Sequence, residues 1–206
     1  MAETIALIDY GAGNLHSVHN AVRAVGATVD VTADPELVAR ADRIILPGVG
    51  AFAACANALR AIDGMVDALE QRVLNDAVPF LGICVGMQLL ATRGIEHGSH
   101  DGLDWIGGEV RAIEPSETVK VPHMGWNDVI PTDGNAGLPI QGEAYFLHGY
   151  HFVADDPAHV AAHSDHGGPL EAAVHRDNII GVQFHPEKSQ KYGLNFLRTF
   201  LDWNPK

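Results

Sequence analysis

Two separate stretches of the sequence carry residue types that could perform covalent catalysis. In the first, PFLGICVGMQLL at residues 79–90, an apolar run ends at Cys84, and Gly82 and Gly86 stand two residues to either side. A side chain at the tip of a tight strand-to-helix turn is pushed outward, and larger flanking residues would collide with neighbouring elements, so this spacing is typical of a nucleophile elbow. A helix N-terminus there would favour the cysteine thiolate, and the Val85 N–H would face a developing oxyanion.

The second stretch, GVQFHPEKS at residues 181–189, supplies a base and a group to orient it. An apolar run leads into His185, and Glu187 follows two residues later. In an extended segment these two side chains project to the same side, so the carboxylate could hold the imidazole in place. Cys84 alone could equally be a buried packing residue, because short motifs match by chance. Together with His185 and Glu187 it predicts a catalytic Cys-His-Glu triad.

The motifs GICVGMQ and QFHPEKS resemble those of the class I (triad) glutamine amidotransferases. Three further stretches narrow the resemblance to the glutaminase subunits of imidazole glycerol phosphate synthase, in histidine biosynthesis: IDYGAGNL at 8–15, PGVGAF at 47–52 and PHMGWN at 122–127. The resemblance spans essentially the whole chain. It implies an enzyme that hydrolyses glutamine to glutamate and ammonia. The ammonia would pass to a (β/α)-barrel cyclase subunit that makes imidazole glycerol phosphate and aminoimidazole carboxamide ribotide.

The resemblance also implies roles for single residues, and it implies no cofactor and no metal site. The oxyanion would be held by the backbone N–H groups of Val49 and Val85. The substrate-binding residues would be Gly50, Gln88, Glu96, His148 and Tyr150. The partner interface would include Asn14, Trp126 and Lys188.

Two positions depart from the pattern of the family. Val49 stands where related amidotransferases commonly have glycine, and a β-branched residue holds φ negative more firmly. We therefore expect the Gly48–Val49 peptide to rest with its N–H turned away from the site and to flip when a partner docks. Gly149 stands where serine is usual, so contact with glutamine at that point is expected through backbone.

Three other functions are compatible with the motifs. A glutaminase subunit could serve another synthase, such as the pyridoxal phosphate one, although PGVGAF and PHMGWN speak against this. A cysteine hydrolase of the same architecture could act alone on peptides or thioesters. A noncatalytic binding module predicts that Cys84 reacts with a thiol probe no faster than Cys55, which we expect to be a packing residue.

The elements that must position these residues alternate along the chain. Apolar runs predict strands at 4–10, 27–31, 43–46 and just before Cys84. Helical spacing predicts helices at 15–25, 34–40, two within 53–77, one continuing over 87–92 and a closing one at 193–203. This alternation predicts an α/β fold with a doubly wound, mostly parallel sheet and flanking helices. Ligands then bind at the carboxyl ends of the strands, where the 48–50 loop and the elbow both lie.

The second half of the chain predicts an added antiparallel β portion. Residues 97–142 are rich in Gly, Asp and Pro, with strands expected near 106–113 and 127–130 and the PHMGW segment between them. A long strand is expected over 143–153. His159 and His163 have a zinc-like spacing, but their segment predicts a strand, so no zinc site is expected. We expect residues 1–206 to form a single glutamine amidotransferase domain.

Composition limits the partners and the compartment. The 206 residues include 13 basic and 26 acidic side chains, a formal net charge of −13. This balance argues against nonspecific nucleic-acid binding and against attraction to an anionic membrane. Two cysteines are too few for a disulfide framework and fit a reducing cytosol. Because MAETIALIDY has no basic n-region and no long apolar stretch, we expect a cytoplasmic protein without a transmembrane segment.

Overall fold

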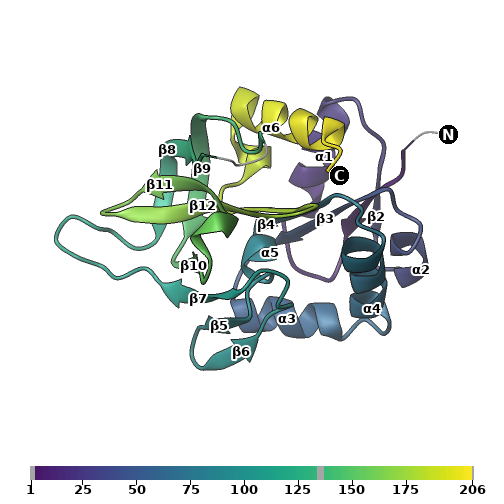
Figure 1. Cartoon of the computed structure of the whole chain (residues 1–206), viewed down its shortest axis with the longest axis horizontal. Coiled ribbons are helices and arrows are strands. Elements are labelled where there is room, and N and C mark those ends of the chain that lie inside the picture. The colour runs from purple at the N-terminus through teal and green to yellow at the C-terminus, as the bar shows by residue number, and fades with distance from the viewer. Residues whose placement is uncertain (1–2, 134–136, 206) are drawn as a thin grey trace.

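The computed structural model describes residues 3–133 and 137–205, and within them the strands form a larger and a smaller β-sheet (Figure 1). The larger sheet has the order β2-β1-β3-β4-β13-β12-β11-β8-β9. Its parallel half consists of β2 (Val29–Thr32), β1 (Ile5–Ile8), β3 (Arg43–Gly48), β4 (Phe80–Cys84) and β13 (Ile179–Val182). Its antiparallel half consists of β12 (Pro169–Arg176), β11 (Val160–Asp165), β8 (His123–Pro131) and β9 (Gly142–His148). The predicted fold class is confirmed, with an antiparallel portion as extensive as the parallel one.

Helices cover both faces of the parallel half (Figure 1). One face carries α1 (Leu15–Ala24) and α6 (Gln190–Asp202), which pack against each other. The other carries α3 (Phe52–Arg60), α4 (Met65–Glu70) and the short α5 (Val85–Gln88). A π-helical turn, Gln71–Asn75, extends α4, and the short α2 (Pro35–Val38) packs against α4. The predicted break between two helices near residue 64 is confirmed, because Gly64 caps α4 with φ +75°.

The core lies between these helices and the parallel strands. Strands β1, β3, β4 and β13 are buried along their whole lengths, and their sequences are near-continuous apolar runs. Both faces of a parallel sheet are covered by its crossover helices, so this composition is the expected one. Each helix contributes one apolar stripe, for example Phe196, Leu197 and Phe200 of α6.

The register around β4 places two loops beside its end. Gly48, the last residue of β3, pairs with Cys84, the last residue of β4. On the other side Val182, the last residue of β13, pairs with Ile83. The chain segments that follow β3, β4 and β13 therefore leave the sheet at the same carboxyl edge.

The smaller sheet corrects the prediction of one long strand over 143–153. The chain breaks at Gly149 into β9 and β10 (Tyr150–Ala154). β9 stays in the larger sheet, whereas β10 pairs with β7 (Gly108–Ala112) in the smaller one. The smaller sheet is completed by β5 (Arg93–Ile95) and β6 (Ser99–Asp101), which were not anticipated. The prediction was wrong because β-strand composition does not tell which sheet a residue joins.

Two other boundaries differ from the predictions. The helix after Cys84 ends at Gln88 instead of continuing to residue 92. The N–H groups of Leu90 and Ala91 donate to carbonyls only three residues back, those of Met87 and Gln88, and the Thr92 N–H donates to the Gly108 carbonyl, so the α-helical pattern is not continued. The PHMGW segment, expected between strands, begins β8, which pairs with β9 along its length. Trp126 therefore lies on a strand and not in a loop.

The helices of residues 3–133 and 137–205 are all too short or too polar to cross a bilayer.

Candidate active site

Cys84 occupies a strained turn between β4 and α5. Its backbone has φ +55° and ψ −112°, outside the regions that non-glycine residues favour. A Cβ atom on Gly86 would lie 1.9 Å from the Leu46 carbonyl oxygen of β3, and one on Gly82 would lie 2.6 Å from the Gly86 carbonyl oxygen. The expected reason for both flanking glycines, collision with the neighbouring strand and helix, is confirmed.

His185 and Glu187 form a buried pair. Nδ1 of His185 lies 2.9 Å from Oε1 of Glu187, and the two side chains are 3% and 1% exposed. The predicted pairing is confirmed, but the extended geometry given as its reason is wrong. Only His185 is extended, whereas Glu187 lies in a 3-10 turn, Pro186–Lys188, that follows it. The turn brings the carboxylate back toward the imidazole.

The charge on His185 is stabilised by its neighbours. Burial opposes a charged ring, but hydrogen bonds to Cys84 and Glu187 and the negative charges of both raise the pKa of His185 to about 9. With that pKa the ring is an imidazolium at neutral pH, beside Cys84. A positive charge beside a cysteine favours the nucleophilic thiolate.

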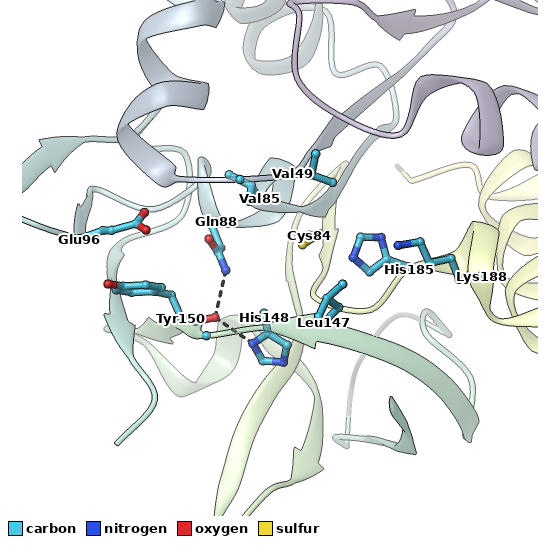
Figure 2. A pocket seen from close by; sticks show the side chains of 12 residues that line it. Val49, Cys84, Val85, Gln88, Glu96, Leu147, His148, Tyr150, His185 and Lys188 are labelled. Carbon is cyan, nitrogen blue, oxygen red and sulfur yellow. Dashed lines mark hydrogen bonds between the residues drawn. The ribbon is translucent and has the colours of Figure 1, made fainter. Parts of the chain in front are cut away.

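A cavity of about 170 Å³ opens over Cys84 and His185 (Figure 2). The predicted oxyanion and substrate residues all line it: Val49, Gly50, Val85, Gln88, Glu96, His148 and Tyr150. Lys188, Leu147 and Gly149 complete the lining. The cavity is smaller than the roughly 300–1,000 Å³ usual for drug-sized ligands, so it suits a small molecule. Glu187 lies behind His185, outside this lining.

Gln88 is fixed by hydrogen bonds inside the protein. Its Nε2 donates to the Tyr150 carbonyl oxygen at 3.1 Å (Figure 2). The same Nε2 donates to Gln183 Oε1 at 3.0 Å, so both N–H groups of the amide are used. A contact with substrate would therefore be made through Oε1. Both ring nitrogens of His148 are likewise engaged, with the Tyr150 carbonyl and with His123. Its substrate role stays a prediction, and any contact would be through ring carbon or backbone.

Glu96 is held at the N-terminus of α3. Its Oε2 accepts a hydrogen bond of 2.6 Å from the Phe52 N–H, the first residue of that helix. A carboxylate at a helix N-terminus satisfies an otherwise unpaired N–H group. The same side chain lines the cavity, so a positively charged group of a ligand there would meet a carboxylate that is already fixed in position.

Three residues for which the sequence predicted no role in the site support it. Gln183 is fully buried and donates to Cys84 Sγ at 3.7 Å. Behind the 48–50 loop, the Tyr10 hydroxyl donates to the Pro47 carbonyl at 2.7 Å, and Cys55 Sγ lies 3.4 Å from the Val49 carbonyl. A polar residue inside the apolar run before His185 was the available signal for Gln183. No sequence signal linked residues 10 and 55 to this loop.

The two cysteines differ in their surroundings. Cys55 is buried, as expected, and burial raises the pKa of its thiol. Cys84 instead lies beside the His185 ring and lines the cavity. These surroundings favour Cys84 over Cys55 as a nucleophile.

Of the three predicted interface residues, Lys188 lines the cavity. Trp126 is 48% exposed and contacts the ring of Tyr145 edge-on. The Lys188 ammonium lies 5.9 Å from the centre of the same ring and also lines the cavity. Asn14 is the residue before α1. Trp126, Tyr145 and Lys188 thus form an aromatic and cationic strip that reaches the cavity.

Metal ligands were also sought in the described ranges. Within residues 3–133 and 137–205, no group of three or more His, Cys, Asp and Glu side chains is placed to hold a metal ion. His159 ends a 3-10 turn and His163 lies in β11, so the pair does not share a helix face.

The chain matches the family model for class I glutamine amidotransferases over residues 6–203. The imidazole glycerol phosphate synthase subunit HisH of Zymomonas mobilis is 59% identical over 208 residues, which cover 99% of this chain and 98% of that protein. The HisH subunit of Rhodospirillum rubrum is 51% identical over 98% of this chain and 99% of its own length.

Solved structures agree on the architecture. A glutamine amidotransferase crystal structure superposes with a TM-score of 0.75 at 19% identity, over 96% of this chain and 97% of that one. The structure of PurLQS from Thermotoga maritima gives a TM-score of 0.70 at 19% identity, over 98% and 99% of the two chains. At such low identity these likenesses bear on the fold alone.

The raised pKa of His185 predicts a pH-dependent effect of Glu187→Gln. A group whose folded pKa lies above its usual value of 6.5 stabilises the protein fully below pH 6.5 and loses that contribution as pH rises through about 9. We expect the variant to lower the pKa of His185, because it removes one of the two groups that raise it. It should destabilise the protein by about 2 kcal/mol at pH 6 and by much less at pH 9.5.

Histidine NMR titration and denaturant unfolding at the two pH values measure both effects. Lys191→Gln, on the adjacent helix, serves as the control for a single charge change. A His185 ring that titrates near pH 9 in the Glu187→Gln protein would contradict the assigned partner.

Proposed function

The chain belongs to the class I glutamine amidotransferase family, among the relatives named imidazole glycerol phosphate synthase subunit HisH, and we propose how it works as their glutaminase subunit. It hydrolyses glutamine to glutamate and ammonia and passes the ammonia to a cyclase subunit of the same synthase. The observation that carries this function is the meeting of Cys84 and His185 at one cavity, with Glu187 bound to His185, in a chain that aligns with these relatives over nearly its whole length. The high identity favours this synthase over the pyridoxal phosphate one.

The reaction proceeds through a thioester on Cys84. The thiolate attacks the side-chain amide carbon of glutamine, and the carbonyl π electrons move to oxygen. As the tetrahedral intermediate collapses, the C–N bond breaks and the His185 imidazolium gives its proton to the leaving ammonia. Neutral His185 then takes a proton from water, which attacks the γ-glutamyl thioester and releases glutamate and the Cys84 thiolate. Glu187 orients the ring throughout.

Substrate contacts follow from the groups that face the cavity. The fixed carboxylate of Glu96 suits the α-ammonium of glutamine, and Oε1 of Gln88 suits an N–H of the substrate. The backbone around Gly149 and Tyr150, and that of Gly50, would bind the remaining polar atoms. A Cβ at Gly149 would have Val121 as its neighbour at 3.6 Å, an ordinary van der Waals contact. A serine side chain would therefore fit at this position, and its absence leaves open space.

The oxyanion donors are the N–H groups of Val85 and Val49. Val85 is the first residue of α5, where N–H groups lack partners within the helix. Val49 follows the Gly48 that pairs with Cys84. We keep the hypothesis that the Gly48–Val49 peptide turns its N–H into the site only when the partner docks. One missing oxyanion donor costs on the order of 3 kcal/mol, about a hundredfold in rate.

A partner must cover the cavity because free ammonia becomes ammonium in bulk water. We place the (β/α)-barrel cyclase of the synthase against Asn14, Trp126 and Lys188, forming a heterodimer in which the ribotide chemistry belongs to the cyclase. Neither nucleic acid nor membrane is assigned as a partner. Both cysteines are free thiols, which supports a cytoplasmic location.

We treat residues 1–206 as one amidotransferase domain. Support comes from a continuous core that joins residues of the larger sheet, such as Phe80, to residues of the smaller one, such as Val110 and Phe152. Residues 1–2, 134–136 and 206 of this range lie outside the described residues.

Glutamate release from glutamine tests the function. We expect activity from this chain with the cyclase partner and its ribotide ligand, a fall of about a hundredfold or more in the chain alone, and none with Cys84→Ala. Cys55→Ala, which removes the other thiol, should remain active with the partner. Equal activity in the free chain would contradict gating by the partner, and activity of Cys84→Ala would contradict the nucleophile.

Trp126→Ala tests the proposed interface. A large exposed aromatic at the centre of an interface commonly contributes about 2 kcal/mol or more, so we expect cyclase binding to weaken by about thirtyfold. Leu37→Ala is the matched control, because Leu37 is 42% exposed on the distant α2. Isothermal titration with the purified cyclase measures both. An unchanged dissociation constant for Trp126→Ala would place the interface elsewhere.

A further inference from the structure

A line of buried and partly buried hydrogen bonds runs from strand β8 toward the cavity. Nδ2 of Asn127 lies 3.0 Å from Nε2 of His123, and Nδ1 of His123 lies 2.9 Å from Nε2 of His148. Nδ1 of His148 lies 2.8 Å from the Tyr150 carbonyl oxygen (Figure 2). His123 and His148 are 4% and 7% exposed. Two histidines of neighbouring strands thus join β8 to the first residue of β10.

The same carbonyl oxygen is joined to the nucleophile. The Tyr150 carbonyl also accepts from Gln88 Nε2, whose second N–H donates to Oε1 of Gln183. Nε2 of Gln183 then donates to Cys84 Sγ at 3.7 Å. The break between β9 and β10 at Gly149 is what places this carbonyl between the two branches.

The carbonyl fixes the direction of the outer branch. A carbonyl oxygen only accepts, so His148 must carry its proton on Nδ1. The Nε2 of a neutral His148 then accepts, which requires a proton on Nδ1 of His123. The Nε2 of His123 in turn accepts from Asn127. With these assignments, every ring nitrogen in the line has a hydrogen-bond partner, and only one arrangement of the ring protons achieves this.

The rings are held neutral, as this order requires. Burial lowers the pKa of His148 to about 3 and that of His123 to about 4. Phe146 stacks on one side of His123 at 4.7 Å between ring centres, and His166 stacks on it at 4.2 Å. Packing therefore leaves the His123 ring little freedom to rotate out of the line.

We propose that His123 and His148 are positioning residues, both neutral with the proton on Nδ1, that fix the Tyr150 carbonyl and through it the orientation of Gln88 and Gln183 beside Cys84. This inference rests on the proposed glutaminase function and adds residues to it that do not touch the reacting atoms. Asn127 is the neighbour of Trp126 in β8, so the outer end of the line lies in the strand that we place against the partner.

The ring protons are read directly by long-range 1H–15N NMR of histidine in the full chain at pH 7. We expect both His123 and His148 to be neutral with Nδ1 protonated. Asn127→Asp puts an acceptor in place of the donor, so it should move a proton to Nε2 of His123. Asp128→Asn, the reverse exchange at the next residue, should leave both rings unchanged. A proton on Nε2 of either ring in the natural chain would overturn the proposal.

Glutaminase kinetics with the cyclase partner test the connection to the site. His148→Asn keeps a donor near the Tyr150 carbonyl, whereas His148→Leu removes it. We expect His148→Leu to raise KM for glutamine at least fivefold and lower kcat at least tenfold, and His148→Asn to recover most of both. A protein that was only partly unfolded would lose kcat at unchanged KM.

An unchanged KM in His148→Leu, or no recovery in His148→Asn, would overturn the positioning role. A natural chain with no glutaminase activity under any condition would instead overturn the proposed function and with it the catalytic part of this inference. The NMR result would still confirm or overturn the proton order, so the two failures are distinguishable.

Discussion

The site depends on the parallel pairing of β4 with β3 on one side and β13 on the other. This pairing brings Gly48 beside Cys84 and delivers the chain that carries His185 to the same sheet edge. It also accounts for the glycines, because the backbone after Cys84 must pass so close to β3 that a Cβ at Gly86 would meet the Leu46 carbonyl at 1.9 Å. The energy that holds Cys84 in its strained conformation comes from the buried strands around it.

Most of the site that could be predicted from the sequence lies on the parallel half of the larger sheet. The parallel strands carry the proposed nucleophile, its proposed base and the proposed oxyanion loop. These could be placed from sequence because each follows an apolar run that predicts a strand. The helices α1 and α6 and the break before α4 were equally accessible, since periodicity and glycine positions are local signals. The three residues of the triad could be predicted without knowledge of the smaller sheet.

What sequence could not provide depends on pairing between distant segments. The chain at Gly149 leaves one sheet for another, and nothing local distinguishes that from a continuous strand. The bond from Gln183 to Cys84 and the line through His123 and His148 join residues 25 to 99 positions apart. The pairing of His185 with Glu187 was predicted for a geometry that the 3-10 turn replaces, because proline at 186 favours a turn that spacing alone does not reveal.

The most direct test of the account is covalent labelling by 6-diazo-5-oxo-L-norleucine, a glutamine analogue whose diazoketone alkylates a nucleophile at the position of the amide. Intact-mass and peptide mass spectrometry of the complex with the cyclase should show one adduct, on Cys84. Excess glutamine should protect against it, and His185→Ala should slow it strongly. Labelling of Cys55, or labelling of Cys84 that glutamine does not compete with, would contradict a glutamine site built on this cysteine.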